Sequence, residues 1–367
     1  MKEGWTYKPF ADCINKIPKQ KQVKSKDYLS SGKYPIVSQE KELISGYWDD
    51  ESYLFKHIKP VIIFGDHTKE IKYIDFDFVV GADGTQILSP KENINGKFFY
   101  YALVATPIRA LGYARHFKLL KEKSFLIPPL SEQQQIVSYL DSSFAHIDEL
   151  KANAEKQLND AKALFQKALE KAMEPKEGWE EKKIKEVGEV VGGTTPNTNN
   201  PAFWGGDICW ISPAELHGEH YLYDSVKKIT EEAVKAKSLK QLPIGTVILS
   251  SRAPIGKLTI NKVPMYCNQG FKCIVCGLDI YNEFLYWWFY GKKEYLNSLG
   301  TGATFPEISK TVVENITIPI PPLSEQQQIV TRLDSLSANI KALEENLEKT
   351  ISECDALKQA LLREVFE

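Results

Sequence analysis

Polar side chains that can read the edges of bases flank several glycine-containing turns of this chain. Arginine and lysine can bind guanine, and asparagine and glutamine can bind adenine, because these side chains offer paired donors or acceptors. The candidates in the second half of the chain are Arg252, within Ser251-Arg-Ala-Pro-Ile-Gly256, and Lys257, Asn268, Gln269 and Lys272. The candidates in the first half are Asp83, Thr85 and Gln86, after a glycine turn, and Arg115, His116 and Lys118, in a basic run. The alternative for each is a polar side chain that only faces solvent.

The sequence lacks the motifs that would make the chain an enzyme by itself. It has no Gly-x-x-x-x-Gly-Lys-Ser/Thr phosphate loop, no Asp/Asn-Pro-Pro-Tyr/Phe methyltransferase motif and no His-Glu-x-x-His metal helix. His217 and His220 are three residues apart, but Gly218 weakens any helix that would aim both at a metal. We therefore expect both histidines to be solvated turn residues, and no metal site.

The six cysteines lack the density and spacing of a disulfide framework, so we expect reduced thiols. Cys273 and Cys276 form a lone Cys-x-x-Cys pair without a second pair at zinc-finger spacing. Their alternation with apolar residues predicts a buried strand.

An internal repeat organises the whole chain. The phrase Ile127-Pro-Pro-Leu-Ser-Glu-Gln-Gln-Gln-Ile-Val137 recurs letter for letter from Ile320 to Val330. Glu3-Gly-Trp5 and Glu177-Gly-Trp179 open the stretches that lead to each copy. One unit is therefore written twice, which is typical of gene duplication rather than of a solenoid of many short repeats.

A long helix is predicted after each copy of the phrase. Ser131 and Ser324 are the predicted N-caps, with Gln134 and Gln327 completing capping boxes. Apolar residues then recur at spacings of three and four over about 40 residues in each copy. The first stripe comprises Ile136, Leu140, Phe144, Ile147, Leu150, Ala154, Leu158, Ala161 and Phe165. The second comprises Ile329, Leu333, Leu336, Ile340, Leu343, Leu347, Ile351, Cys354, Leu357, Leu361 and Val365.

Stripes of this length must pair with another surface. Burial within a helical bundle would satisfy one such helix, but two matched helices that issue from matched modules favour an antiparallel pair with pseudo-twofold symmetry. The helices would then act as a spacer between the modules.

Between the helices the pattern is mixed. Short β-branched and aromatic runs, such as 60–64 and 246–250, are broken by turn residues, which indicates modules of the α+β class. The predicted domains are a first module at 1–127, a first helical spacer at 128–175, a second module at 176–320 and a second helical spacer at 321–367.

Charge is unevenly distributed, although the formal net charge of the chain is only −2. Residues 1–127 hold 20 Lys and Arg against 15 Asp and Glu, and residues 176–320 are balanced. The helical stretches 128–175 and 321–367 are both acidic. A polyanion should therefore meet the modules rather than the helices.

The doubled phrase leading into a long helix resembles the conserved regions of the DNA specificity subunit of type I restriction-modification systems. Four motifs of the second module are similar, in order, to that family's target recognition domain: Glu177-Gly-Trp179, Gly192-Gly-Thr-Thr-Pro196, Phe203-Trp-Gly-Gly-Asp207 and Ser251-Arg-Ala-Pro-Ile-Gly256. The first module keeps Glu3-Gly-Trp5 but lacks counterparts of the Gly-Gly-Thr-Thr-Pro and Trp-Gly-Gly phrases.

The resemblance implies a subunit that performs no chemistry itself. Each module would read one half of a bipartite, asymmetric target in double-stranded DNA. The helices would set the distance between the half-sites and dock methyltransferase subunits and, through them, the restriction subunit. The chain itself would hold no cofactor, because S-adenosylmethionine and ATP would be bound by those partners.

Two other functions are alternatives to DNA recognition. The first is a non-enzymatic coiled-coil adaptor whose modules bind protein or surface ligands, and the second is a self-sufficient enzyme, which the missing motifs argue against. No apolar run reaches the roughly 18 residues that span a bilayer, and the first residues do not resemble a signal peptide, so we expect a cytoplasmic protein without a membrane partner.

Overall fold

The computed structural model describes residues 4–109, 112, 115–302 and 306–366. The chain divides into two compact units, one comprising residues 1–156 and 347–367 and the other residues 157–346. The two long helices are α4 (Leu130–Ala172) and α10 (Leu323–Phe366), and each contributes to both units. No helix in the described part of the chain is long and apolar enough to cross a membrane.

The first module contains three small sheets. Strand β1 (Thr6–Pro9) pairs antiparallel with β11 (Ser124–Ile127), which directly precedes α4. A second sheet has the order β2-β10-β7-β8, and in a third β9 pairs with β3, β4 and β6 while β5 pairs with β4. The bounds of these strands are β2 Ile14–Asn15, β3 Gln22–Val23, β4 Tyr34–Val37, β5 Gly46–Trp48, β6 Leu54–Phe55, β7 Val61–Gly65, β8 Ile71–Ile74, β9 Phe78–Gly81 and β10 Thr85–Pro90.

Short helices complete the first module. They are α1 (Phe10–Cys13), α2 (Gly96–Ala105), α3 (Phe117–Lys121) and the 3-10 turns Ser25–Asp27 and Glu51–Tyr53. Buried phenylalanines from β7, α1, α2 and β11 form one core, in which the Phe99 and Phe125 rings meet edge to face with centroids 5.0 Å apart. The core joins the β2-β10-β7-β8 sheet to helices α2 and α3.

The second module repeats this plan. Strand β12 (Glu180–Lys183) pairs antiparallel with β21 (Thr317–Ile320), which directly precedes α10. The main sheet has the order β13-β20-β17-β18-β15, and a smaller one has the order β16-β14-β19. Their bounds are β13 Gly188–Gly192, β14 Trp204–Ile211, β15 Tyr221–Leu222, β16 Lys228–Ile229, β17 Val247–Ser250, β18 Leu258–Asn261, β19 Tyr266–Cys267 and β20 Phe271–Cys276.

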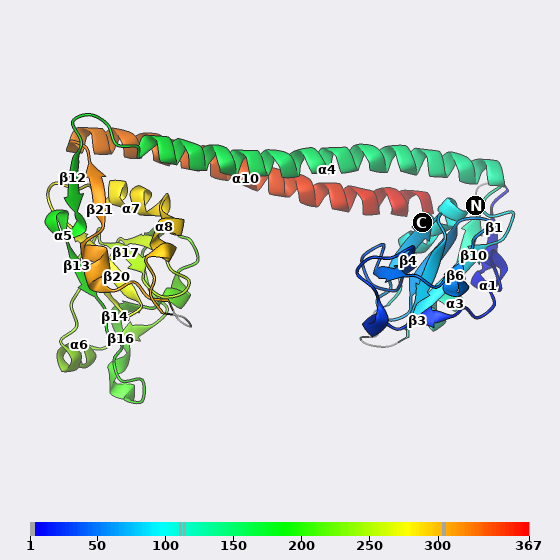
Figure 1. The fold of residues 1–367 in the computed structure, drawn as a ribbon, viewed down its shortest axis with the longest axis horizontal. Helices are drawn as coiled ribbons and strands as arrows, with labels where there is room; N and C mark the ends of the chain where they lie inside the picture. Colours follow the sequence, from blue (N-terminus) through cyan, green and yellow to red (C-terminus); the bar gives the residue numbers. More distant parts are fainter. Residues whose placement is uncertain (1–3, 110–111, 113–114, 303–305, 367) are drawn as a thin grey trace. The chain divides into compact units, whose positions relative to one another are not determined.

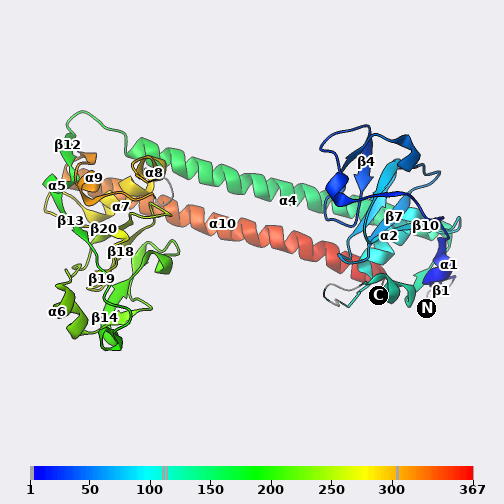
Figure 2. The ribbon, with the colours of Figure 1, turned by 60° about the horizontal axis from the view of Figure 1, so that its bottom comes forward.

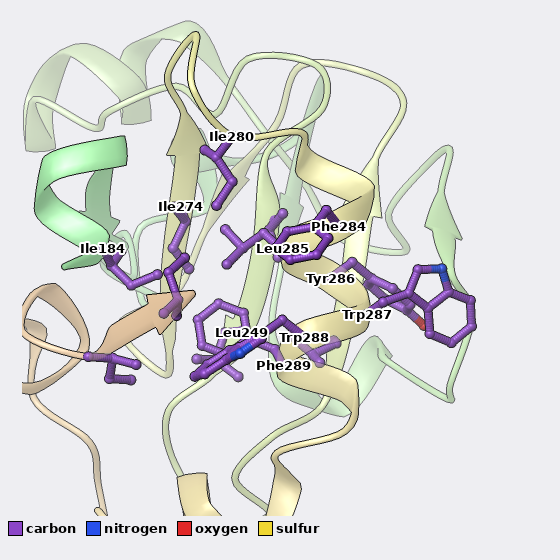
Figure 3. Close-up of a cluster of buried hydrophobic side chains, with 14 of the residues drawn as sticks. Ile184, Leu249, Ile274, Ile280, Phe284, Leu285, Tyr286, Trp287, Trp288 and Phe289 are labelled. Carbon is purple, nitrogen blue, oxygen red and sulfur yellow. The ribbon is translucent and has the colours of Figure 1, made fainter. Parts of the chain in front are cut away.

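The helices of the second module are α5 (Ile184–Val187), α6 (Glu231–Lys237), α7 (Asn282–Tyr290), α8 (Lys293–Ser298) and α9 (Lys310–Glu314), with 3-10 turns at Pro201–Phe203 and Pro213–Glu215. Helix α7 covers the main sheet. In Figure 3 its Phe284, Leu285 and Phe289 lie beside Leu249 of β17 and Ile274 of β20, all fully buried. Cys273 and Cys276 both lie on β20, which confirms the strand predicted there.

The two long helices run antiparallel where they pair within each unit (Figures 1 and 2). In the first unit Lys358 contacts Asp148, and Lys151 Nζ lies 2.7 Å from Asp355 Oδ1, so residue numbers fall along α10 as they rise along α4. In the second unit Leu169 of α4 and Leu333 of α10 belong to one buried cluster. The predicted fold class is confirmed: two mixed helix-and-sheet modules with paired, antiparallel long helices.

The capping prediction was wrong at both helix starts. Helices α4 and α10 begin one residue before the predicted caps, and the carbonyls of Pro129 and Pro322 accept their first backbone hydrogen bonds. Ser131 and Ser324 are therefore helical and exposed. The prolines hold the cap position because they need no N–H partner and their φ already suits a helix start.

The apolar stripe is narrower than predicted. From residue 140 to residue 161 the buried residues of α4 recur every seven positions, at Leu140, Ile147, Ala154 and Ala161, and Phe165 and Leu169 are buried after them. Leu150, Leu343 and Leu357, which the stripes include, are 58%, 40% and 48% exposed. A pair of helices buries only the seam between them, so apolar positions beside that seam stay accessible.

A buried glutamine fixes the start of each long helix to its own module. Gln133 is fully buried; its Oε1 accepts the Asn95 N–H at 2.7 Å, and its Nε2 donates to the carbonyls of Pro128 at 2.9 Å and Asn93 at 3.2 Å. Asn95 caps α2, so this amide ties the start of α4 to the start of α2.

The second repeat builds the same contact. Gln326 is fully buried, its Oε1 accepts the Tyr281 N–H at 2.7 Å, and its Nε2 donates to the carbonyls of Pro321 at 2.8 Å and Asp279 at 2.9 Å. Tyr281 precedes α7 as Asn95 precedes α2. The repeated phrase therefore encodes one helix-to-module joint, used twice.

Replacing Gln133 with leucine should destabilise the first unit by about 2–4 kcal/mol, because buried backbone donors and acceptors lose their partners. Urea unfolding of the full chain, followed by circular dichroism, measures this. Gln134→Leu is the matched control, since Gln134 is exposed on the next position of the same helix; its effect should stay within about 0.5 kcal/mol. Equal losses of unfolding free energy in both variants would show that the buried Gln133 amide does not hold the helix to its module.

Candidate functional site

The turns with the candidate residues of the second module gather at one end of its main sheet. Strand β13 ends at Gly192 opposite Lys272, and β17 ends at Ser250 opposite Phe271. The turns that follow β13 and β17, and the one that precedes β20, therefore leave the sheet at the same end. We call residues 193–195, 251–254 and 268–270 the turn surface.

Backbone contacts hold these turns together. The Thr194 N–H donates to the Cys267 carbonyl at 2.9 Å, and the Ser251 N–H donates to the Gly270 carbonyl at 2.8 Å. A side chain at Gly193 would place its Cβ 2.1 Å from the Cys267 carbonyl oxygen, so only glycine fits there. The second glycine of the Gly-Gly-Thr-Thr-Pro motif is thus needed for close packing against the 267–270 turn.

Arg252 lies on the turn surface in an ion-pair cluster that the sequence did not reveal. Its Nε donates to Glu307 Oε2 at 2.8 Å, and Lys272 Nζ donates to Glu307 Oε1 at 3.2 Å and to Ser251 Oγ at 3.0 Å. Burial raises the pKa of Glu307, but the hydrogen bonds and charges of Arg252 and Lys272 outweigh it, so the pKa lies below its ordinary value. Glu307 therefore stays an anion between two cations.

The other candidates of the second module differ in exposure. Lys257 donates from Nζ to the carbonyls of Pro213 at 3.0 Å and Leu216 at 2.8 Å, so its ammonium is engaged within the module. Asn268 is half-buried and accepts the Gly270 N–H at 2.9 Å, which shapes its own turn. Gln269 is exposed and accepts the Thr195 hydroxyl at 2.6 Å. Arg252 and Gln269 are the exposed candidates of this set.

The candidates of the first module lie at the corresponding end of its β2-β10-β7-β8 sheet. There β7 ends at Gly65 opposite Thr85, where β10 begins. The next residue, Asp66, joins the two candidate segments: its N–H donates to the Gly84 carbonyl at 2.8 Å, and its carbonyl accepts the His116 N–H at 2.8 Å. The structure thus brings 83–86 and 115–118 together, which sequence spacing could not show.

Exposure again separates these residues. Asp83, Arg115 and Lys118 are exposed, whereas Gln86 is half-buried. Thr85 is buried and donates to the Gly81 carbonyl at 2.6 Å, and His116 is buried with its Nδ1 3.0 Å from the Asp66 carbonyl oxygen. Thr85 and His116 therefore hold the turns in place, and Asp83, Arg115 and Lys118 face outward.

His220 is not the solvated turn residue that the sequence predicts, although His217 is exposed. The His220 ring stacks on Tyr286 with centroids 3.9 Å apart, and its Nε2 lies 2.8 Å from Glu283 Oε2. Glu283 is buried at the start of α7, so the histidine supplies a partner that burial requires. Among the described residues, no group of three or more His, Cys, Asp or Glu could hold a metal ion.

Comparison with known proteins gives this arrangement a family context. The sequence pattern of the type I restriction modification DNA specificity domain matches residues 2–160 and again residues 176–353. The type I restriction enzyme EcoR124I/EcoR124II specificity subunit of Escherichia coli is 30% identical over 355 residues, which cover 91% of this chain and 87% of that protein. The MjaIX specificity subunit of Methanocaldococcus jannaschii is 46% identical over 178 residues, 47% of this chain but only 41% of that protein.

Solved structures share the fold. A chain from a structure on complex assembly and conformational transition of the type I R-M system has a TM-score of 0.75 at 20% identity, covering 98% of this chain and 97% of that chain. The crystal structure of the HsdS subunit from Thermoanaerobacter tengcongensis has a TM-score of 0.59 at 20% identity, covering 100% of this chain and 97% of that one. The duplicated modules and long helices are therefore a known architecture.

The buried Glu283 makes stability depend on acid pH. Burial raises the pKa of Glu283, but His220 and Lys262 lower it by more than burial raises it. The pKa therefore lies below the ordinary 4.5. The stabilisation is thus present above that ordinary value and is lost as pH falls through the lowered one. Between about pH 6 and pH 3 the thermal midpoint of the full chain should fall more for the wild type than for Glu283→Gln.

Glu294→Gln, at an exposed glutamate of α8, is the control and should keep the wild-type pH profile. Circular dichroism at each pH follows the midpoints. Parallel profiles for the wild type and Glu283→Gln would show that the pair carries no pH-linked stability.

Proposed function

This chain belongs to the type I restriction-modification DNA specificity family, and we propose that it reads a bipartite, asymmetric target in double-stranded DNA, one half with each module. The observation that carries the proposal is the pair of corresponding sheet ends. In both modules, accessible polar side chains lie where the equivalent strands β7 and β17 end and β10 and β20 begin.

The two sheet ends share a scaffold but not a chemistry. The first module presents Asp83, Arg115 and Lys118, and the second presents Arg252 and Gln269. Different donors and acceptors favour different bases, so the two half-sites should differ. A single chain with two unlike modules can read an asymmetric target, whereas a symmetric dimer reads a palindrome.

Charge supports contact through the modules. The first module has an excess of basic residues, and both helical stretches have an excess of acidic ones. Phosphates attract cations and repel carboxylates, so duplex DNA should avoid the helices. The helices remain available to set the distance between half-sites and to dock protein partners.

These partners would supply the chemistry. The relatives are named as specificity subunits of type I restriction enzymes. We propose that this chain likewise performs no reaction and docks methyltransferase subunits, which bind S-adenosylmethionine, and through them a restriction subunit, which uses ATP. The candidates on these partner-docking and spacer helices are Ile136, Leu140, Phe144, Ile147, Leu158, Phe165, Ile329, Leu333, Leu336, Ile340, Leu343 and Leu347. Six of them are buried within the chain, namely Leu140, Ile147, Phe165, Ile329, Leu333 and Leu347, so a partner would meet the others, of which Leu343 is the most exposed.

Co-purification followed by methylation mapping tests this function. The full chain should co-purify with an adenine methyltransferase, and methylated adenines should mark one bipartite sequence in genomic DNA only when the chain is present. A chain that co-purifies with no methyltransferase and changes no methylation would contradict the proposal. Salt-insensitive binding to another protein, without DNA binding, would favour the adaptor function instead.

Arg252→Ala should weaken specific binding by about 1–3 kcal/mol, because a bidentate contact with a base would be lost. Electrophoretic mobility shifts with cognate and scrambled duplexes measure the discrimination. Lys240→Ala is the matched control: Lys240 is an exposed cation of the same module, paired with Glu189 as Arg252 is with Glu307. Unchanged discrimination in Arg252→Ala would exclude Arg252 from base reading.

A further inference from the structure

We propose that Glu307 is a positioning residue that holds the Arg252 guanidinium in the orientation for reading one base of the second half-site. The inference rests on the proposed function, and it names the residue on which specificity at one position depends. Glu307 lies far from Arg252 in sequence and outside every motif of the second module.

Among the described residues, Glu307 holds the Arg252 guanidinium through one nitrogen. The guanidinium Nε–H donates to Glu307 Oε2 at 2.8 Å, while the Arg252 side chain remains 48% exposed. A guanidinium carries five N–H donors in one plane, so a hydrogen bond at Nε restricts how that plane can turn and leaves the two terminal nitrogens as the remaining donors. Two parallel N–H groups of this kind match the O6 and N7 acceptors of guanine.

The carboxylate is itself fixed by a buried lysine. Lys272 Nζ donates to the other oxygen, Glu307 Oε1, at 3.2 Å and to Ser251 Oγ at 3.0 Å, and its side chain is only 9% exposed. Both carboxylate oxygens therefore have a cationic partner. Lys272, a candidate base reader from the sequence, takes the role of holding Glu307 in this arrangement.

The backbone fixes the same pair. Residues Arg252 and Glu307 form an antiparallel bridge, and Glu307 also exchanges backbone hydrogen bonds with Thr301, at 3.1 and 3.0 Å. The Ile308 N–H donates to the Ser251 carbonyl at 2.9 Å. The main chain on both sides of the pair is thus anchored, which limits how far the Glu307 carboxylate can move with the guanidinium.

Such preorganisation bears on affinity and selectivity. A free arginine side chain loses rotamer freedom when it binds a base, whereas one already held loses less. Removing Glu307 should therefore weaken the base preference at the single position that Arg252 reads. The preferences at positions read by other residues should not change.

The experiment selects bound sequences from a randomised duplex library. The protein is the full chain, purified with whatever subunits accompany it, as wild type, Arg252→Ala, Glu307→Gln, the double variant and Glu307→Asp. Glu189→Gln is the control, because it removes another ion-paired carboxylate and makes the same charge change in the same module. Thermal unfolding verifies that each variant folds.

In the wild type, one position of the second half-site should show a preference for guanine that Arg252→Ala reduces about tenfold. Glu307→Gln should reduce the preference at that same position several-fold and at no other. The double variant should match Arg252→Ala, since Glu307 acts only through the arginine. Glu307→Asp should retain part of the preference, and Glu189→Gln should retain all of it.

Two results separate failure of this inference from failure of the function. If the wild type selects no sequence, the proposed function, sequence-specific DNA recognition by this chain, is wrong. If the wild type selects a bipartite target but Glu307→Gln and Glu307→Asp keep full preference at the Arg252 position, or lose preference evenly at all positions, Glu307 does not position the arginine.

Discussion

The direction in which each long helix leaves its module depends on one fully buried side-chain amide. Gln133 and Gln326 each accept an N–H from the residue that precedes a module helix and donate to carbonyls on both sides of the joint. An amide can do this because it offers both a donor and an acceptor. A rotation of the helix start would leave buried backbone groups without partners, which is costly in an apolar setting.

Further contacts along each helix extend this joint. Two turns on, Asp141 accepts the Tyr101 hydroxyl from α2, and Asp334 accepts the Trp287 indole N–H from α7 at 2.8 Å. Each module also packs against the end of the long helix that belongs to the other repeat. The ring centroids of Phe366 and Phe98 lie 5.4 Å apart, and those of Phe165 and Trp287 lie 5.7 Å apart. Each unit therefore contains packed residues from both repeats.

The helix-to-module joints are alike in the two repeats, whereas the ends of the two sheets differ in their side chains. Where β7 ends the chain continues with Asp66, which caps α3 by accepting the Phe117 N–H at 2.8 Å. Where β17 ends, the chain continues through Ser251 to Arg252, which pairs with Glu307. Equivalent turns thus hold an acid with a structural role in one module and an outward cation in the other, so the scaffold tolerates divergence there without loss of its core.

The sequence by itself determined the duplication, the α+β modules, the two long helices and the family, because exact repetition and helical periodicity are local patterns. It misplaced the helix caps, since the carbonyls of Pro129 and Pro322 accept the first helical N–H groups, and it misjudged His220, whose partner Glu283 lies 63 residues away. Only the tertiary structure decided which candidates face outward: it buried His116, Thr85 and Lys272, engaged Lys257 and brought Glu307 to Arg252. Such pairings depend on how strands and turns meet across the fold, which residue spacing along the chain does not encode.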